Sequence, residues 1–166
     1  MKKRSVLLLC ASLMSAAAWA RTEDRNQRAE FRAGRSTENA GVVEFSRGFE
    51  LTQGSLTITS DSARVFRDDK GALVRIEIIG KESEPARWRE ELDDGSPLDG
   101  RAERIDYFLQ DEKVTLIGQA QVRKAGDEMR AETINYDLNT QQLDAGGDSD
   151  KPVLFIYTPP QKPADG

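Results

Sequence analysis

Apolar and polar residues alternate with a period of two along much of this chain, most clearly between residues 48 and 62. There Phe49 and Leu51 alternate with polar neighbours, a Gln-Gly pair follows, and Leu56 and Ile58 resume the alternation. This pattern predicts a β-hairpin with one apolar side and one solvent-facing side. Runs with the helical period of about 3.6 residues are absent beyond residue 20, so we expect an all-β fold.

The same pattern recurs later in the chain, which predicts two sequence repeats. Without gaps, Val43, Phe45, Phe49, Leu51, Ser60, Asp61 and Val65 align with Val114, Leu116, Ala120, Val122, Ala131, Glu132 and Tyr136. In both copies the apolar phase slips by one residue, near Asp61 and near Glu132. Such a slip turns the apolar side outward unless a bulge corrects it. We therefore expect bends at both points, and an antiparallel sheet that folds over on itself within one domain.

Five other segments can be assigned from local pattern. A weak strand is expected at residues 29–33, around Phe31, followed by a turn at residues 36–41, and residues 73–79 form the strongest single strand. Residues 90–100 have no period and are expected to form a loop between the two halves. The last strand is expected at residues 153–157, where every residue is apolar, and Pro159 and Pro160 end it.

The first 20 residues have the features of a secretory signal peptide. A basic start precedes a short apolar run that ends in Ala-Trp-Ala. The alternative is a lipoprotein signal acylated at Cys10, but the Leu9 before it is larger than such sites usually accept. We expect a signal peptide at 1–20, one domain at 21–158 and a disordered tail at 159–166. Because the remaining chain has no cysteine, the bacterial periplasm is the expected compartment.

The composition excludes several functions. The chain carries 24 basic and 29 acidic residues, a net charge of −5, which argues against nucleic-acid binding. It has no histidine and a single cysteine, which falls in the signal, so histidine- and thiol-based catalysis is excluded. The acidic pairs at 68–69 and 93–94 lie in turns, and the acidic residues around 144–150 lack the spacing of a calcium loop. We expect no enzyme activity, no metal and no cofactor.

Several motifs, taken in order, resemble the OstA-like family of periplasmic lipopolysaccharide-transport proteins. They are Gly41-Val-Val-Glu-Phe45, Leu51-Thr-Gln-Gly-Ser-Leu-Thr-Ile58, Glu84-Pro-Ala-Arg-Trp88, Leu98-Asp-Gly-Arg-Ala102, Ile105-Asp-Tyr107, Val114-Thr-Leu-Ile-Gly118 and Ile134-Asn-Tyr-Asp137. The chain departs from the family at its first strand, and it inserts Ser46-Arg47 before Gly48. The resemblance implies a folded-over antiparallel β-jellyroll, open along one side, whose apolar interior carries the acyl chains of lipopolysaccharide.

The resemblance also implies partners and site residues. Subunits would join edge to edge, with an inner-membrane anchor protein at the N-terminal edge and an outer-membrane translocon at the C-terminal edge. The residues expected to line the groove for lipid A are Phe45, Phe49, Leu51, Leu56, Ile58, Val65, Ile76, Ile78, Trp88, Ile105, Tyr107, Leu116, Val122, Met129, Ile134 and Tyr136. The residues expected at partner-binding edges are Phe31, Val42, Val43, Val153, Phe155 and Tyr157.

Two other functions fit the same composition. One is a periplasmic carbohydrate-binding β-sandwich with Trp88 and Tyr107 as stacking platforms, and the other is a structural adaptor with a packed interior. Lipid A phosphates would be repelled by the net negative charge, so affinity for lipid would have to come from apolar contact. Arg75, Arg87 and Arg104 would add only local attraction.

Overall fold

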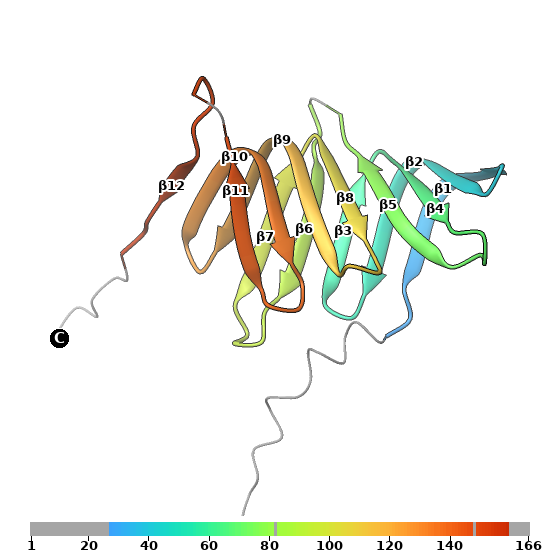
Figure 1. The fold of residues 1–166 in the computed structure, drawn as a ribbon, viewed down its shortest axis with the longest axis horizontal. Helices are drawn as coiled ribbons and strands as arrows, with labels where there is room; N and C mark the ends of the chain where they lie inside the picture. The colour runs from blue at the N-terminus through green and yellow to red at the C-terminus, as the bar shows by residue number, and fades with distance from the viewer. Residues whose placement is uncertain (1–26, 82, 148, 160–166) are drawn as a thin grey trace, which may run out of the picture.

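The computed structural model describes residues 27–81, 83–147 and 149–159, which form strands, turns and bends without a helix (Figure 1). The expected signal peptide and nearly all of the expected tail lie outside these residues. The strands are β1 (Glu30–Asn39), β2 (Val42–Gln53), β3 (Leu56–Ser60), β4 (Ser62–Arg67), β5 (Leu73–Ile79), β6 (Ala86–Glu91), β7 (Pro97–Ala102), β8 (Arg104–Phe108), β9 (Lys113–Lys124), β10 (Asp127–Asp137), β11 (Gln142–Gly146) and β12 (Leu154–Ile156). The all-β class expected from the period-two alternation is confirmed.

All twelve strands belong to one sheet, and every pairing within it is antiparallel. Its order is β11-β10-β9-β7-β6-β3-β2-β4-β5-β8, and β8 pairs again with β9, which closes a ring. β1 pairs with β2 outside this ring, and β12 pairs with β10. The sheet is therefore barrel-like in its pairing. A jellyroll open along one side remains a prediction.

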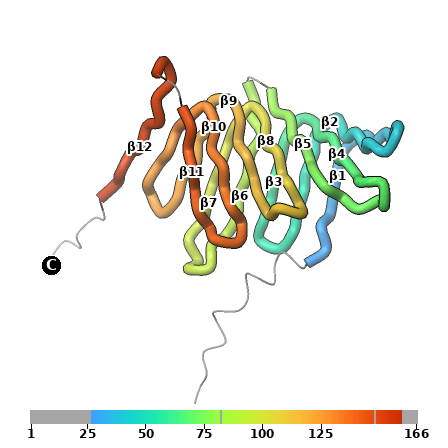
Figure 2. The backbone as a smooth tube through the Cα atoms, viewed as in Figure 1, coloured from blue at the N-terminus to red at the C-terminus, as the bar shows by residue number. Residues whose placement is uncertain are grey.

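Two strands join the halves of the folded sheet. The first part of β2 pairs with β4 and its second part with β3. In the same way, the first part of β9 pairs with β8 and its second part with β7. Two layers result, which we name by their central strands: the β3–β6–β7 layer and the β4–β5–β8 layer. β1 and β12 lie at opposite ends of the molecule, as the blue and red segments of Figure 2 show.

The strands change layer at a row of bends, and these bends explain the phase slips in the sequence. In β2 the bend falls at Arg47 and Gly48, and in β9 at Gly118 and Gln119, and all four have positive φ. The pairing of β10 with β9 shifts register between residues 131 and 133, and β3 gives way to β4 at residue 61. The expected bends near Asp61 and Glu132 are thus observed, although the duplication of one unit remains a prediction.

Two local assignments were wrong. The first strand does not end near residue 33 but runs to Asn39, because a register shift at Gly34 lets it follow β2 through its bend. The expected loop at 90–100 is instead the turn of a hairpin, since β6 extends to Glu91 and β7 begins at Pro97. The apolar–polar alternation of this hairpin is hard to recognise in the sequence, because the turn is short and polar and residue 100 is a glycine. Within the described residues, we find no helix with the length and apolar character needed to cross a membrane.

Candidate lipid-binding interior

The apolar side chains of the two layers meet in a single interior. Its members come from β2 to β10 and are exposed by no more than 9%. Of the sixteen residues expected to line a groove, fourteen belong to this buried cluster, and Phe45 and Met129 are half-buried at its margin. The structure thus brings the expected residues together, because alternate residues of the strands from β2 to β10 point inward. In this structure they pack against one another and fill the space between the layers.

Trp88 is packed closely in the middle of the β3–β6–β7 layer. Its ring lies 4.8 Å from that of Tyr136, which reaches across from the other layer. Gly100 is its cross-strand neighbour, and a Cβ built on this glycine would lie 2.6 Å from the indole ring. Real Cβ atoms essentially never come so close, so the absence of a side chain at residue 100 makes room for the tryptophan.

At the N-terminal end the interior is lined by three aromatic rings. Phe31 of β1 lies 6.0 Å from Phe45 and 6.3 Å from Phe49, and the last two lie 5.4 Å apart. Phe49 is buried, whereas the other two are half-buried. Such spacings are favourable for aromatic pairs. The apolar interior therefore continues to the N-terminal edge strand without interruption.

At the C-terminal end the interior reaches solvent. Phe155 of β12 pairs with Met129, which in turn pairs with Val122 on the inner side of β9. Phe155 is 57% exposed, and Val153, Leu154, Ile156 and Tyr157 are exposed too. The last strand is therefore not buried in its own core. A contiguous run of exposed apolar side chains of this kind marks an interaction site.

The residues expected at the edges differ in position. Phe31 lies on β1, which among the described residues pairs only with β2, so the other side of β1 is an unpaired edge there. Val42 and Val43 lie on β2, which is held by β1 on one side and β4 on the other, so their assignment to an edge was wrong. Phe155 lies on an edge too, since within the described part of the chain β12 pairs with β10 alone, and Val153 and Tyr157 flank that strand.

Few polar groups enter the buried parts of the molecule. Asp106 of β8 is buried and ion-paired to Arg104, with Nε 3.1 Å from Oδ1. Burial raises the pKa of Asp106, and the nearby Glu77 adds to the rise, while Arg104 and Arg75 oppose it. In the described parts of the chain, no three His, Cys, Asp or Glu residues are grouped so that they could hold a metal ion. The chemistry available in the interior is apolar contact.

Sequence reasoning missed part of this interior. Leu92 and Leu98 are buried but fall in the segment read as a loop, and Val114 and Leu138 are buried near strand ends. Five small residues also belong to the buried cluster, namely Ala63, Ala86, Ala102, Ala120 and Ala131. The alternation of Leu98 with Gly100 and Ala102 was a usable signal, but a single large residue within it was too little to identify a strand.

Comparison with known proteins places this geometry in a family. Residues 33–142 match the family described as LptA/(LptD N-terminal domain) LPS transport protein. This match covers most of the chain, from β1 to the start of β11. The chain belongs to the LptA/LptD N-terminal-domain family.

Individual members of the LptA/LptD N-terminal-domain family resemble the chain over most of its length. The lipopolysaccharide export system protein LptA of Haemophilus influenzae is 30% identical over 122 residues, covering 72% of this chain and 69% of the relative. LptA of Escherichia coli K12 is 28% identical over 159 residues, covering 93% and 85%. LptH of Pseudomonas aeruginosa is 28% identical over 165 residues, covering 94% and 93%.

A solved structure supports the fold. The crystal structure of Pseudomonas aeruginosa LptH, described as the LptA homologous periplasmic component of the conserved lipopolysaccharide transport device, superposes with a TM-score of 0.74. It covers 82% of this chain and 99% of LptH, at 24% identity. The likeness shows that the two chains share an all-β fold.

Proposed function

We propose that this protein is a periplasmic component of lipopolysaccharide transport and that it carries the acyl chains of lipopolysaccharide in its apolar interior. The observation that carries the proposal is the continuous apolar surface between the two layers, which runs from Phe31 at one edge strand to Phe155 at the other. The LptA and LptH relatives, named as export-system proteins, support the same function. A non-enzymatic carrier needs no catalytic group.

The energetics favour acyl chains over the polar part of the lipid. Each buried methylene contributes about 0.8 kcal/mol, so a few acyl segments supply tens of kcal/mol before costs are counted. Exposed charge pairs contribute about 0–1 kcal/mol each. Because the interior is filled by side chains, entry of a lipid requires the layers to separate. We infer that they part on the side of the hairpin turns, opposite the row of bends.

The test is photocrosslinking in cells from neighbouring positions of one strand. Ile76 of β5 points into the interior, whereas its neighbour Glu77 points to the outer face of the β4–β5–β8 layer. A photoreactive residue at 76 is expected to give a lipopolysaccharide adduct, and one at 77 is not. Adducts are also expected from residue 58 on the opposite layer. Absence of adducts from both inner positions in a functional protein would refute the proposal.

We further propose that copies of this chain associate end to end through β1 and β12. Both strands have one unpaired edge, and strand addition there would extend the sheet and the apolar interior together. Phe155→Arg places a charge in this contact, whereas Arg130→Gln changes a charge on the outer face of the neighbouring strand. Sedimentation analysis is expected to show weaker self-association for the first variant only. If both variants assemble like the unaltered protein, the edge is not the contact.

The same edges provide sites for unlike partners, with an inner-membrane anchor protein at β1 and an outer-membrane translocon at β12. Export to the periplasm would use residues 1–20 as a signal peptide, leaving the domain at 21–158. The carbohydrate-binding alternative predicts binding of soluble sugar through Trp88 and Tyr107, yet both are buried, at 1% and 4% exposure. Lipid analysis of the protein purified from cells distinguishes the two functions, since only a carrier retains lipopolysaccharide.

A further inference from the structure

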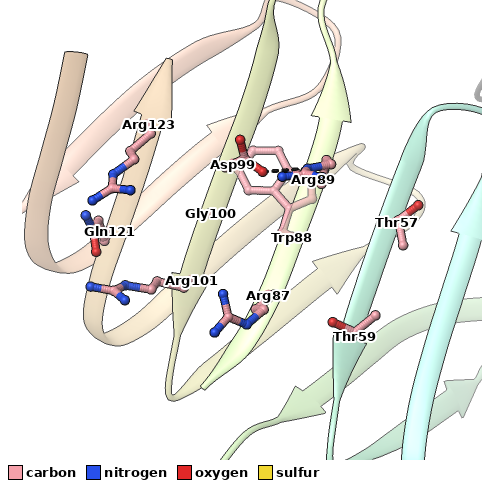
Figure 3. A pocket seen from close by; sticks show the side chains of 10 residues that line it. All are labelled: Thr57, Thr59, Arg87, Trp88, Arg89, Asp99, Gly100, Arg101, Gln121 and Arg123. Carbon is pink, nitrogen blue, oxygen red and sulfur yellow. Dashed lines mark hydrogen bonds and ion pairs between the residues drawn. The ribbon is translucent and has the colours of Figure 1, made fainter. Parts of the chain in front are cut away.

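Four arginines gather on the outer face of the β3–β6–β7 layer, away from the apolar interior. Arg87 and Arg89 come from β6, Arg101 from β7 and Arg123 from β9. They line a hollow of about 580 Å³ together with Thr57, Thr59, Trp88, Asp99, Gly100 and Gln121 (Figure 3). Asp99 is the one carboxylate among the described residues that line it. This is a positively charged hollow on a protein of net negative charge.

The lining side chains form two rows across the strands, and one row is balanced in charge. Arg89 stands opposite Asp99, and its Nε lies 2.6 Å from the carboxylate oxygen. Arg123 binds Glu128 at 2.8 Å, and Arg130 binds the same carboxylate. These contacts hold the pKa of Glu128 below its usual range, Arg123 contributing most. Every cation of this row has a partner within the protein.

The second row is not balanced. Arg87 of β6 stands directly opposite Arg101 of β7, with Thr59 and Gln121 as the next members on either side. Among the described residues, neither Arg87 nor Arg101 forms an ion pair. Like charges directly opposite each other on neighbouring strands are destabilising. A bound anion would remove this cost.

A third observation points to a ligand at the same place. Gln121 lines the hollow beside Arg101 and is only 4% exposed, and its Oε1 has no hydrogen-bond partner in the structure. A buried amide oxygen without a donor destabilises the folded protein, because it has lost its hydrogen bonds to water and gained none in return. In Figure 3, Arg87 and Arg101 extend in the same direction from neighbouring strands, with Gln121 and Arg123 beyond them. A hydroxyl group of a ligand held by the arginines would satisfy Gln121.

We propose that the Arg87–Arg101 pair binds a phosphate monoester carried on a saccharide. A phosphate monoester has a charge of about −1.5 to −2 at pH 7, so one group balances both guanidinium groups, whereas one carboxylate balances only one. The planar guanidinium fork also matches phosphate oxygens in a bidentate manner. Sugar hydroxyls fit the remaining lining, since Thr59 and Gln121 both donate and accept hydrogen bonds.

The size and polarity of the hollow agree with such a ligand. Small-molecule sites typically enclose roughly 300–1,000 Å³, and this one falls within that range. Leu98 points to the other face of the sheet, and Trp88 is the one large apolar residue among those that line the hollow. The four arginines therefore favour the phosphorylated sugar over an acyl chain, and the site does not depend on lipid binding in the interior.

The experiment is calorimetric titration of the purified full chain in buffer free of phosphate and sulfate. Glucose 1-phosphate is expected to bind, glucose not to bind, and inorganic phosphate to bind more weakly than the sugar phosphate. Arg101→Gln and Arg87→Gln should each weaken binding of glucose 1-phosphate by about tenfold or more. Arg64→Gln on β4 removes the same charge from the other layer and should change the affinity by less than about twofold.

A second measurement does not depend on the ligand. Because Arg101→Gln relieves the like-charge pair, it should raise the midpoint of thermal unfolding in phosphate-free buffer. A lowered midpoint would contradict the claim that Arg87 and Arg101 repel each other in the absence of a ligand. The proposal is overturned if glucose 1-phosphate fails to bind, if a tetraglutamate peptide binds more tightly, if inorganic phosphate binds equally well, or if Arg64→Gln weakens binding as much as Arg101→Gln. The photocrosslinking test of the interior at residue 58 and this titration are independent, so either one can fail without the other.

Discussion

The middle of the folded sheet and its two ends are built from the same kind of strand, but only in the middle are the inward-facing side chains covered. In the middle, inward side chains from both layers bury one another, and residues such as Ile58, Ile78 and Trp88 have almost no exposed surface. At the ends the same inward phase continues, yet no further strand covers it, and Phe155 remains 57% exposed. The middle thus buries its own apolar side chains, whereas the ends leave theirs available for contact with another molecule.

The two ends also differ from each other. β1 is ten residues long, and its second half places Ser36 and Glu38 opposite the inward-facing Phe45 and Val43 of β2. β12 has three residues and exposes apolar side chains on both faces. An interface between unlike ends is heterologous and generates open assemblies instead of closed dimers. Subunits that join through β1 and β12 would therefore form a filament with a direction.

The largest difference between middle and end should appear in stability. Trp88→Ala removes a fully buried indole and its contact with Tyr136, and we expect it to lower the free energy of unfolding by about 3–5 kcal/mol. Phe155→Ala, at the exposed end, should lower it by no more than about 0.5 kcal/mol. Urea unfolding followed by far-ultraviolet circular dichroism measures both losses, because this signal does not depend on a tryptophan. Similar losses in the two variants would show that the end is part of the core.

The two bends provide a smaller contrast. Gly118 has a φ of 78°, and a Cβ there would lie 2.5 Å from a carboxylate oxygen of Glu103. Gly48 has a φ of 86°, but a Cβ there would meet nothing within 4 Å. We expect Gly118→Ala to lower the free energy of unfolding by about 2–3 kcal/mol. Gly48→Ala should lower it by about 1–2 kcal/mol, because only the strained backbone conformation contributes there. Thermal unfolding of the pair tests this order, and equal midpoints would mean that Glu103 moves aside freely.

Much of the middle could be predicted from sequence because it depends on a local pattern. Alternation at Phe49, Leu51, Leu56 and Ile58 identifies both the hairpin and its inner face, since the side-chain period of a strand is two. The phase slip at residue 61 locates a bend because register is strongly specified where one face is buried. The residues that line the interior can therefore be predicted from the local sequence of each strand, without knowledge of its neighbours.

What could not be predicted depends on the pairing of strands. Arg87 and Arg101 are opposite each other only through the register of β6 with β7, and that hairpin was read as a loop. Val42 and Val43 looked like an edge because nothing in their own segment shows that β1 and β4 flank it. Whether apolar side chains fill the interior or leave a groove depends on the distance between the layers, which no local pattern encodes.

The smallest expected effect concerns two carboxylates whose surroundings act in opposite directions. Burial raises the pKa of Asp106 on β8, in the β4–β5–β8 layer. The guanidinium groups of Arg123 and Arg130 lower the pKa of Glu128 on β10, beside the end strand. Asp106 therefore costs stability once the pH rises above the ordinary value of 3.8, and Glu128 adds stability above its ordinary 4.5.

The two amide variants should consequently show opposite pH dependence. Asp106→Asn removes a charge that the folded state disfavours, so it should raise the thermal midpoint at pH 7, and the gain should shrink as the pH falls toward 3.8. Glu128→Gln should lower the midpoint at pH 7, and the loss should disappear as the pH falls below 4.5 through the lowered pKa. Thermal unfolding between pH 3 and pH 7 measures both effects. If both variants shift the midpoint in the same direction at pH 7, burial does not dominate at Asp106, because its ion pair with Arg104 then outweighs the loss of solvent.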